Sequence, residues 1–538
     1  MMITTTLLLL TAATHTGHEH GLIDWNCGRY DPRPDPASLP FRPAPSTHLG
    51  SNQNFASGQV GANRVDIVFL GDGYTQPELG TYANRVNVLS AALMDSAPYN
   101  NYQNYFNIHR VDVVSNESGV DNDPIGVFRD TALNMAFSSS AGNNLLHIDL
   151  GQAAAYAQNA PDVDTIIALA NSSKYGGTGF YASSVSTAPA HSASSPEIVK
   201  HEFGHGFGQL ADEYFAAGTT YPGGEQSRAN ISVQTAEEML TSGSKWASWF
   251  DFDSPSTNGP VGVYEGAYHY QFGMNRPSPN SLMRSLGKPF NAPSREAVIL
   301  EIYKLVQPID DSSDPNLIHD ETATLFVTPM QPMNYDLDVS WSLDGALLPG
   351  VDSNELPLCS LGLAPGWHAV QVSVVDNSPQ VRNEIARAQF MTQTLLFPIF
   401  SNGTNAAEIY CTAAPNSAGP GASIGFNGSS SLQANDLELT VSGAVPGTPG
   451  LFLSGTSVLE LPFGDGYRCA GGSLVRFAAQ VVDAQGSATR PVDFTHFPNG
   501  LSLQAGDPRS FQFWFRDPTG PGGSGFNLSN GLNLRLCP

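Results

Sequence analysis

The stretch at residues 197–214, EIVKHEFGHGFGQLADEY, places His201 and His205 four positions apart. In an α-helix, residues at i and i+4 lie one turn apart on the same face, so the two imidazole rings can converge on one point. Zinc accepts neutral imidazole nitrogens, and the intervening Glu202 can act as a base toward a water molecule that the metal activates. The spacing therefore predicts a metal-binding helix that carries a catalytic carboxylate.

The flanking residues predict where this helix begins and ends. Residues 194–196 (SSP) are typical of an N-cap and first turn, and the carboxylate of Glu197 favours a helix N-terminus. Glycines follow at positions 204, 206 and 208, and each weakens a helix by roughly 1 kcal/mol relative to alanine. We therefore expect the helix to end near Gly208, where a sharp bend turns the chain back toward the metal.

The returning chain is expected to supply the third metal ligand. In the extended pattern H-E-x-x-H-x-x-G-x-x-H, the third histidine corresponds to Ala211 here, and alanine cannot bind a metal. The next residues, Asp212 and Glu213, carry carboxylates, which bind zinc at about 2.0–2.2 Å. Asp212 is favoured because it requires one extra loop residue, and Glu213 is the alternative. The more distant Glu265 and His269 rank below Asp212.

The string HEFGHGFGQLADEY resembles the signature of the IgA-peptidase (M64) family of zinc metallopeptidases, H-E-F-G-H-x-F-G-x-L-A-D-E-Y. Residues 65–79, 106–121 and 261–284 resemble the family in the same order, so the resemblance spans roughly residues 65–303. It implies a metzincin-like catalytic domain, zinc endopeptidase activity and secretion. By the same resemblance, Met283 is the methionine of the Met-turn, a hydrophobic floor beneath the ligand histidines.

The sequence departs from the family around this methionine. Family members tend to have cysteines on both sides of it, whereas this chain has Ser281 before it and Asn291 and Pro293 after it, so a local disulfide is absent. Some metzincins place a tyrosine two residues after the methionine. That position is Ser285 here, so the sequence does not support a tyrosine ligand from this loop.

The segment that resembles the peptidase family has the sequence pattern of an α/β layer. Apolar runs at residues 64–70, 106–114 and 163–170 predict buried strands, and 77–96 and 294–305 have the periodicity of amphipathic helices. The glycine-rich stretch 175–183 fits a hairpin turn or an edge strand that lines the cleft and pairs with an extended peptide. The family resemblance favours the edge strand.

After residue 320 the pattern changes to short alternating strands with frequent turn signals, which predicts all-β modules. The expected fold is an α/β (α+β) metzincin-like catalytic domain followed by two all-β modules, the first an immunoglobulin- or fibronectin-like sandwich with Trp341 in its core. The last module is expected to be a stabilising cap, with contact to a glycan or surface polymer as the alternative. The predicted segments are a signal peptide (1–14), an extended segment (15–55), the peptidase domain (56–308), the sandwich (321–393) and the C-terminal module (396–538), with a polar linker at 310–320.

Composition and charge limit the possible partners and cellular location of the protein. The net charge is −25 and the pI about 4.7, which argues against nucleic acid because such partners require a basic surface. Leu7 to Leu10 form a short apolar run typical of a secretory signal, and no other stretch approaches the ~18 apolar residues of a membrane span. Histidines at 15, 18 and 20 fit a solvated N-terminus better than a metal tract.

Five cysteines, at 27, 359, 411, 469 and 537, contain no C-x-x-C pair, so zinc fingers are not indicated. Those at 411, 469 and 537 could supply one bridge within the last module of a secreted protein. The sequence thus predicts a secreted zinc endopeptidase that acts on a protein or peptide substrate. The alternatives are a non-catalytic secreted adhesin built on the same domain and, for His201 and His205, a structural pair held by Glu202.

Overall fold

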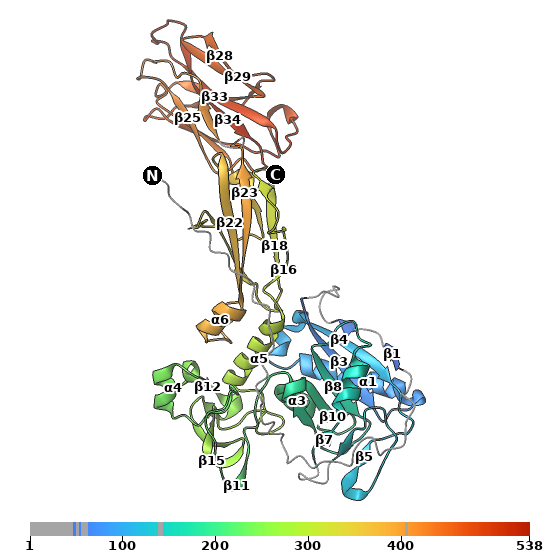
Figure 1. The fold of residues 1–538 in the computed structure, drawn as a ribbon. Helices are drawn as coiled ribbons and strands as arrows, with labels where there is room; N and C mark the ends of the chain where they lie inside the picture. The colour runs from blue at the N-terminus through green and yellow to red at the C-terminus, as the bar shows by residue number, and fades with distance from the viewer. Residues whose placement is uncertain (1–46, 50–52, 55–62, 138–143, 404–406, 538) are drawn as a thin grey trace, which may run out of the picture.

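The computed structural model describes residues 47–49, 53–54, 63–137, 144–403 and 407–537 (Figure 1). The expected signal segment, the histidines at 15, 18 and 20, and Cys27 lie outside these residues. The molecule is elongated: a mixed α/β region forms one end, and two β modules follow it in a row. In the described part of the chain, no helix has both the length and the apolar character needed to cross a membrane.

The α/β region is built on a seven-stranded sheet in the order β1-β4-β3-β8-β10-β9, with β2 also paired to β4. Its four central strands, β4 (Phe106–Val113), β3 (Val65–Asp72), β8 (Thr165–Ala170) and β10 (Val185–Pro189), run parallel. The edge strands are antiparallel: β1 (Thr47–Leu49), β2 (Gln53–Asn54) and β9 (Thr178–Phe180). The three predicted apolar strands are thus confirmed. A small sheet of β5 (Asp121–Asn122), β6 (Ala136–Phe137) and β7 (Leu146–His147) lies beside them.

Helices cover both faces of this sheet, which explains why β3 and β8 are buried along their whole length and read as apolar runs. Ile67 and Phe69 pack under α1 (Leu79–Met94) and α3 (Ser195–Gly206). The alternate residues Val68 and Leu70 pack under α2 (Leu150–Ala157). The helix predicted at 77–96 is therefore α1, with Tyr82, Val86, Leu89 and Leu93 buried as expected.

After α3 the chain forms a subdomain that borders the site. Strands β11 (Phe215–Thr220), β15 (His269–Arg276) and β14 (Tyr264–Ala267) form a sheet in that order. Helix α4 (Ala236–Ser242) and the two-stranded pair β12 (Asp253–Ser254) and β13 (Gly259–Pro260) lie between them in sequence. The predicted closing helix is α5 (Ala292–Leu305).

The first β module contains two sheets. One has β16 (Ile309–Ser312), β18 (Thr324–Pro329) and β21 (Glu355–Pro357). The other has β17 (His319–Asp320), β23 (Thr392–Ser401), β22 (Gly366–Val375), β19 (Asp338–Leu343) and β20 (Ala346–Leu347), and α6 (Glu384–Phe390) precedes β23. Trp341 is fully buried, which confirms it as a core residue.

The expectation of a plain linker at 310–320 is wrong, because β16 and β17 lie within it. Its polar composition has a structural cause: Asp310 accepts hydrogen bonds from the guanidinium of Arg64, at 2.6 and 3.0 Å, in the α/β region. The apolar core also continues across this junction, from Tyr303 and Val306 of the α/β region to Leu325 and Leu358 of the module.

The last module is also all-β. Its main sheet contains β24 (Glu408–Tyr410), β34 (Phe526–Arg535), β33 (Pro508–Arg516), β27 (Pro449–Gly455), β30 (Val475–Arg476) and β31 (Gln480–Val481). The others are β25 (Ser423–Asn427), β26 (Glu438–Ser442), β32 (Ala488–Pro491), β28 (Ser457–Phe463) and β29 (Gly466–Gly471). Cys411 bonds to Cys469 inside the module, as one of the expected pairings, and Cys359 bonds to Cys537 between the modules.

Candidate active site

Helix α3 carries the candidate site and has the start that the sequence predicts. Ser194 is its N-cap residue, Pro196 lies in the first turn, and Glu197 is the acidic residue of that turn. Ser195 anchors this end, because its hydroxyl donates to the carbonyl oxygen of Pro189 at 2.6 Å. The helix ends at Gly206, within two residues of the expected position.

The three glycines near the end of α3 are required for close packing. A Cβ at position 204 would lie 2.9 Å from the sulfur of Met283, and one at position 206 would lie 2.5 Å from the hydroxyl of Ser186. The bend that returns the chain is not made by Gly208, contrary to expectation. Its left-handed residue is Gln209, with φ of 55°, and the side-chain amide of Gln209 donates to the carbonyl oxygens of Tyr181 and Gly206.

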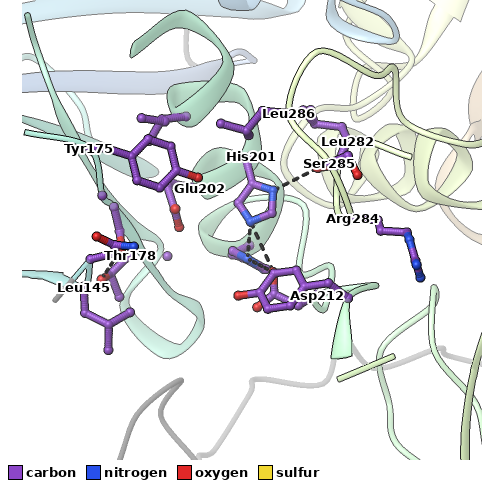
Figure 2. Close-up of a pocket in the computed structure, with 17 residues that line it drawn as sticks. Leu145, Tyr175, Thr178, His201, Glu202, Asp212, Leu282, Arg284, Ser285 and Leu286 are labelled. Atoms are coloured by element: carbon purple, nitrogen blue, oxygen red, sulfur yellow. Dashed lines mark hydrogen bonds and ion pairs between the residues drawn. The ribbon is translucent and has the colours of Figure 1, made fainter. Parts of the chain in front are cut away.

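The bend brings three predicted ligands together (Figure 2). The Nε2 atoms of His201 and His205 lie 3.1 Å apart, and each is 3.2 Å from Oδ1 of Asp212. Tetrahedral ligands with bonds of about 2.0–2.2 Å lie roughly 3.3–3.5 Å from one another, so the triangle has the size that a zinc ion requires. Within the described residues, this is the group of histidines and carboxylates with the spacing to hold a metal ion.

The hydrogen bonds of the two rings direct the same nitrogen of each toward Asp212. Nδ1 of His201 lies 3.0 Å from the carbonyl oxygen of Leu282, and Nδ1 of His205 lies 2.7 Å from that of Leu210. Because a carbonyl oxygen can only accept, each Nδ1 carries a hydrogen. In the neutral rings, the Nε2 lone pairs therefore face each other and a carboxylate oxygen, an arrangement that a cation between them would stabilise.

The pKa values of His201 and Asp212 also favour a positive charge within the cluster. Burial lowers the pKa of His201, but the hydrogen bond to Asp212 and the negative charges of Glu202 and Asp212 outweigh this and raise the pKa to about 9. Burial raises the pKa of Asp212, but the neighbouring histidines hold it well below its usual range. Both shifts favour a positive charge beside the Asp212 carboxylate, so the donor set fits a divalent cation.

Glu202 lies in the cleft beside these ligands. The cleft has a volume of about 450 Å³ and is lined by α3, by residues 144–145 and 175–179, by Asp212 and Tyr214, and by residues 282 and 284–286. Burial raises the pKa of Glu202, against the lowering effect of the two histidines. The carboxylate is close to the edge strand, because a Cβ at Gly177 would lie 2.6 Å from its Oε1. As the edge-strand interpretation expects, β9 is the last strand of the sheet and residues 175–179 line the cleft, whereas pairing with a peptide stays a prediction.

The alternative third ligand, Glu213, has its carboxylate elsewhere. It is fully buried and accepts hydrogen bonds from Ser281 at 2.7 Å, from Asn291 at 3.0 and 3.1 Å, and from Asn230 at 3.0 Å. Ser281 and Asn291 are the residues found where the family tends to have cysteines. A buried hydrogen-bond network around Glu213 therefore connects the two sides of the Met283 segment in this chain.

The other named residues take distinct positions. Met283 is fully buried beneath Gly204, and its carbonyl oxygen accepts a hydrogen bond from the Glu213 amide at 2.8 Å. Glu265 accepts from the Gly273 amide at 3.0 Å within its own hairpin, and it is not among the residues that line the cleft.

Sequence reasoning missed Tyr181 and ranked His269 low. The Tyr181 hydroxyl lies 3.0 Å from Nδ1 of His205, and Nε2 of His269 lies 3.3 Å from Oδ2 of Asp212. The available signal for His269 is its position inside segment 261–284, one of those that resemble the family, whereas no sequence pattern distinguishes Tyr181 from the other tyrosines.

A glutamate flanked by two convergent histidines, in a cleft bordered by an edge strand, is the arrangement expected of a peptidase active site. Residues 55–258 match the family model described as IgA Peptidase M64, which confirms the family resemblance over these residues and supports a hydrolase that cleaves proteins. The resemblance of residues 261–284 lies beyond the match and stays a prediction. No curated protein matches the chain. A solved structure titled "Crystal structure of tetra-tandem repeat in extending region of large adhesion protein" is 14% identical, over 40% of this chain and 45% of that chain, with a TM-score of 0.14.

Proposed function

We propose that this chain is a secreted zinc-dependent endopeptidase. The observation that carries the proposal is the triangle formed by the two Nε2 atoms and Oδ1 of Asp212, with sides of 3.1 and 3.2 Å, next to Glu202 in the cleft. Two imidazoles and one carboxylate form a ligand set typical of catalytic zinc, which keeps one position for water or substrate. His201, His205 and Asp212 would hold the ion.

When bound, zinc supplies Lewis acidity, which makes a water molecule nucleophilic near neutral pH and polarises the scissile carbonyl. Glu202 is the general base: its carboxylate takes a proton from the attacking water and then passes it to the leaving amine. The cleft beside β9 would align the substrate as an extended peptide, because β9 is the last strand of the sheet and residues 175–179 line the cleft. This alignment holds the scissile bond beside Glu202, and it favours cleavage within a chain.

Two further observations support secretion. Two cysteine pairs are bonded, one within the last module and one between modules, and such bonds persist in oxidising compartments. The chain is also strongly acidic, with a net charge of −25, which suits solubility outside a cell. Secretion would be tested by N-terminal sequencing of protein recovered from the culture medium, which should begin after residue 14.

The activity is tested by measuring zinc content and the hydrolysis of casein or gelatin. We expect about one zinc per chain, hydrolysis that a chelator abolishes and zinc restores, and loss of hydrolysis in Glu202→Gln with zinc retained. Glu237→Gln is the matched control, because Glu237 is exposed on α4 and the change removes the same charge. Undiminished proteolysis by Glu202→Gln would exclude this mechanism. Zinc-free protein without proteolysis would instead favour the adhesin alternative.

A further inference from the structure

The two oxygens of the Asp212 carboxylate have different neighbours. Oδ1 faces His201 and His205, at 3.2 Å from each Nε2. Oδ2 faces His269, whose Nε2 lies 3.3 Å away. Asp212 is almost fully buried, whereas the His269 side chain is 40% exposed, so His269 is not explained as a core residue. The approach of the His269 ring to Oδ2 of Asp212 therefore requires another explanation.

The backbone at His269 is held in a costly conformation. Tyr268 and His269, the first residue of β15, form the tip of the β14–β15 hairpin, because Ala267 pairs with Tyr270 across them. Both turn residues have positive φ, 53° and 66°. Turns of this kind favour Asn-Gly, because other side chains are strained there. A tyrosine and a histidine occupy the turn against this preference.

The surrounding contacts fix this turn onto the loop that carries Asp212. The amide of Tyr268 donates to the carbonyl oxygen of Asp212 at 2.8 Å, and the amide of His269 donates to that of Tyr214 at 3.0 Å. The ring of His269 packs edge-on against Tyr214, with centroids 5.0 Å apart. The hairpin tip thus contacts both the backbone and the side chain of the loop, and this keeps the imidazole directed at Oδ2.

We propose that His269 is a positioning residue, which donates a hydrogen bond to Oδ2 of Asp212 and so keeps Oδ1 directed at the metal position between His201 and His205. The inference rests on the proposed function, since it assigns a second layer to that metal site. Groups that orient a metal ligand in this way typically contribute about 10–100-fold to metal affinity.

The test is zinc affinity, measured by competition with a chromophoric chelator on the full chain. His269→Gly removes the donor and also relaxes the strained turn. We expect zinc to bind about 10–100-fold more weakly, while the melting temperature of the metal-free protein stays the same or rises. A residue that only supports the fold would show the reverse pattern, with lower stability and unchanged zinc affinity.

Two variants keep the test decisive. His269→Gln places an amide nitrogen near the position of Nε2 and should restore affinity to within about threefold of the original, whereas His269→Asn tolerates the turn but is too short and should bind zinc as weakly as His269→Gly. Tyr268→Asn is the matched control, because it changes the neighbouring turn residue without removing the donor. Its zinc affinity should stay unchanged.

Unchanged zinc affinity in both His269→Gly and His269→Asn would overturn the inference. A fall in turnover with zinc affinity unchanged would also overturn it, because that pattern indicates direct contact with the substrate. If the original protein binds no zinc, the proposed function fails as well. If the original binds zinc and only the His269 variants behave contrary to expectation, the proposed function stands and the positioning role is wrong.

Discussion

The phenol of Tyr303, on helix α5 of the α/β region, donates a hydrogen bond of 2.8 Å to the Asp376 carboxylate of the first β module. Tyr102 and Tyr335 donate to the same oxygen, at 3.0 and 3.1 Å. Asp376 is fully buried, so a single carboxylate connects both parts of the chain out of contact with water. Helix α5 extends from this junction to Asn291, its N-cap residue, which also binds Glu213 near the site.

Asp376→Ala should therefore destabilise both parts together. It leaves buried phenols without an acceptor, and each such group costs about 1–3 kcal/mol. We expect one cooperative urea transition, monitored by tryptophan fluorescence and by hydrolysis, to move to lower denaturant in the variant. Asp352→Ala is the control, because Asp352 is exposed in the same module, and it should leave the transition in place. Separate transitions for the two parts would show that the junction does not couple them.

Asp212 and Glu213 are adjacent in the sequence, but their carboxylates have different surroundings. Substitutions at the two positions should therefore have different effects on zinc binding and on stability. Asp212→Asn should lower bound zinc sharply, because a neutral amide replaces a charged ligand. Glu213→Gln should retain zinc but lower the melting temperature, because its amide NH₂ would face the donor groups of Ser281, Asn291 and Asn230. Zinc analysis and thermal melting on both variants test this. Loss of zinc from Glu213→Gln with stability intact would reverse the assignment.

Asp212 and Glu213 also show which features of the site can be predicted from the sequence and which cannot. The spacing of His201 and His205 and the position of Asp212 are local, because four residues make a helical turn and a short loop returns the chain. The partners of Glu213 and Asp212 could not be predicted in the same way: Ser281, Asn291 and His269 lie about 60 to 80 positions away, and tertiary folding brings them near. The pairing of Cys359 with Cys537 was missed for the same reason, since spacing alone does not determine which cysteines meet.

Glycine at position 177 is expected to be required for catalysis. A Cβ there would lie 2.6 Å from Oε1 and 2.8 Å from Cγ of Glu202, so Gly177→Ala must displace the carboxylate or the edge strand. Because displacements of about 1 Å in an active site can reduce rates by 10²-fold, we expect kcat to fall by about tenfold to a hundredfold with zinc content unchanged. Gly80→Ala on α1, where a Cβ meets no atom within 4 Å, is the matched control and should retain full kcat. Equal kcat for the two variants would show that the close approach of the backbone at Gly177 does not constrain Glu202.

The Cys359–Cys537 bond closes a loop of 178 residues between the first β module and the end of the last one. A bond across so long a stretch restricts the unfolded chain, and removing a native disulfide typically costs about 2–5 kcal/mol. The double variant Cys359→Ser, Cys537→Ser should therefore lower the calorimetric melting transition of the β modules. Peptide hydrolysis below that transition should persist, because neither cysteine lines the cleft.

Cys411→Ser with Cys469→Ser is the comparison, since that bond lies within the last module and closes a separation of 58 residues. The shorter loop predicts a smaller entropic contribution, so a larger loss of stability from this second pair would contradict the loop-length argument.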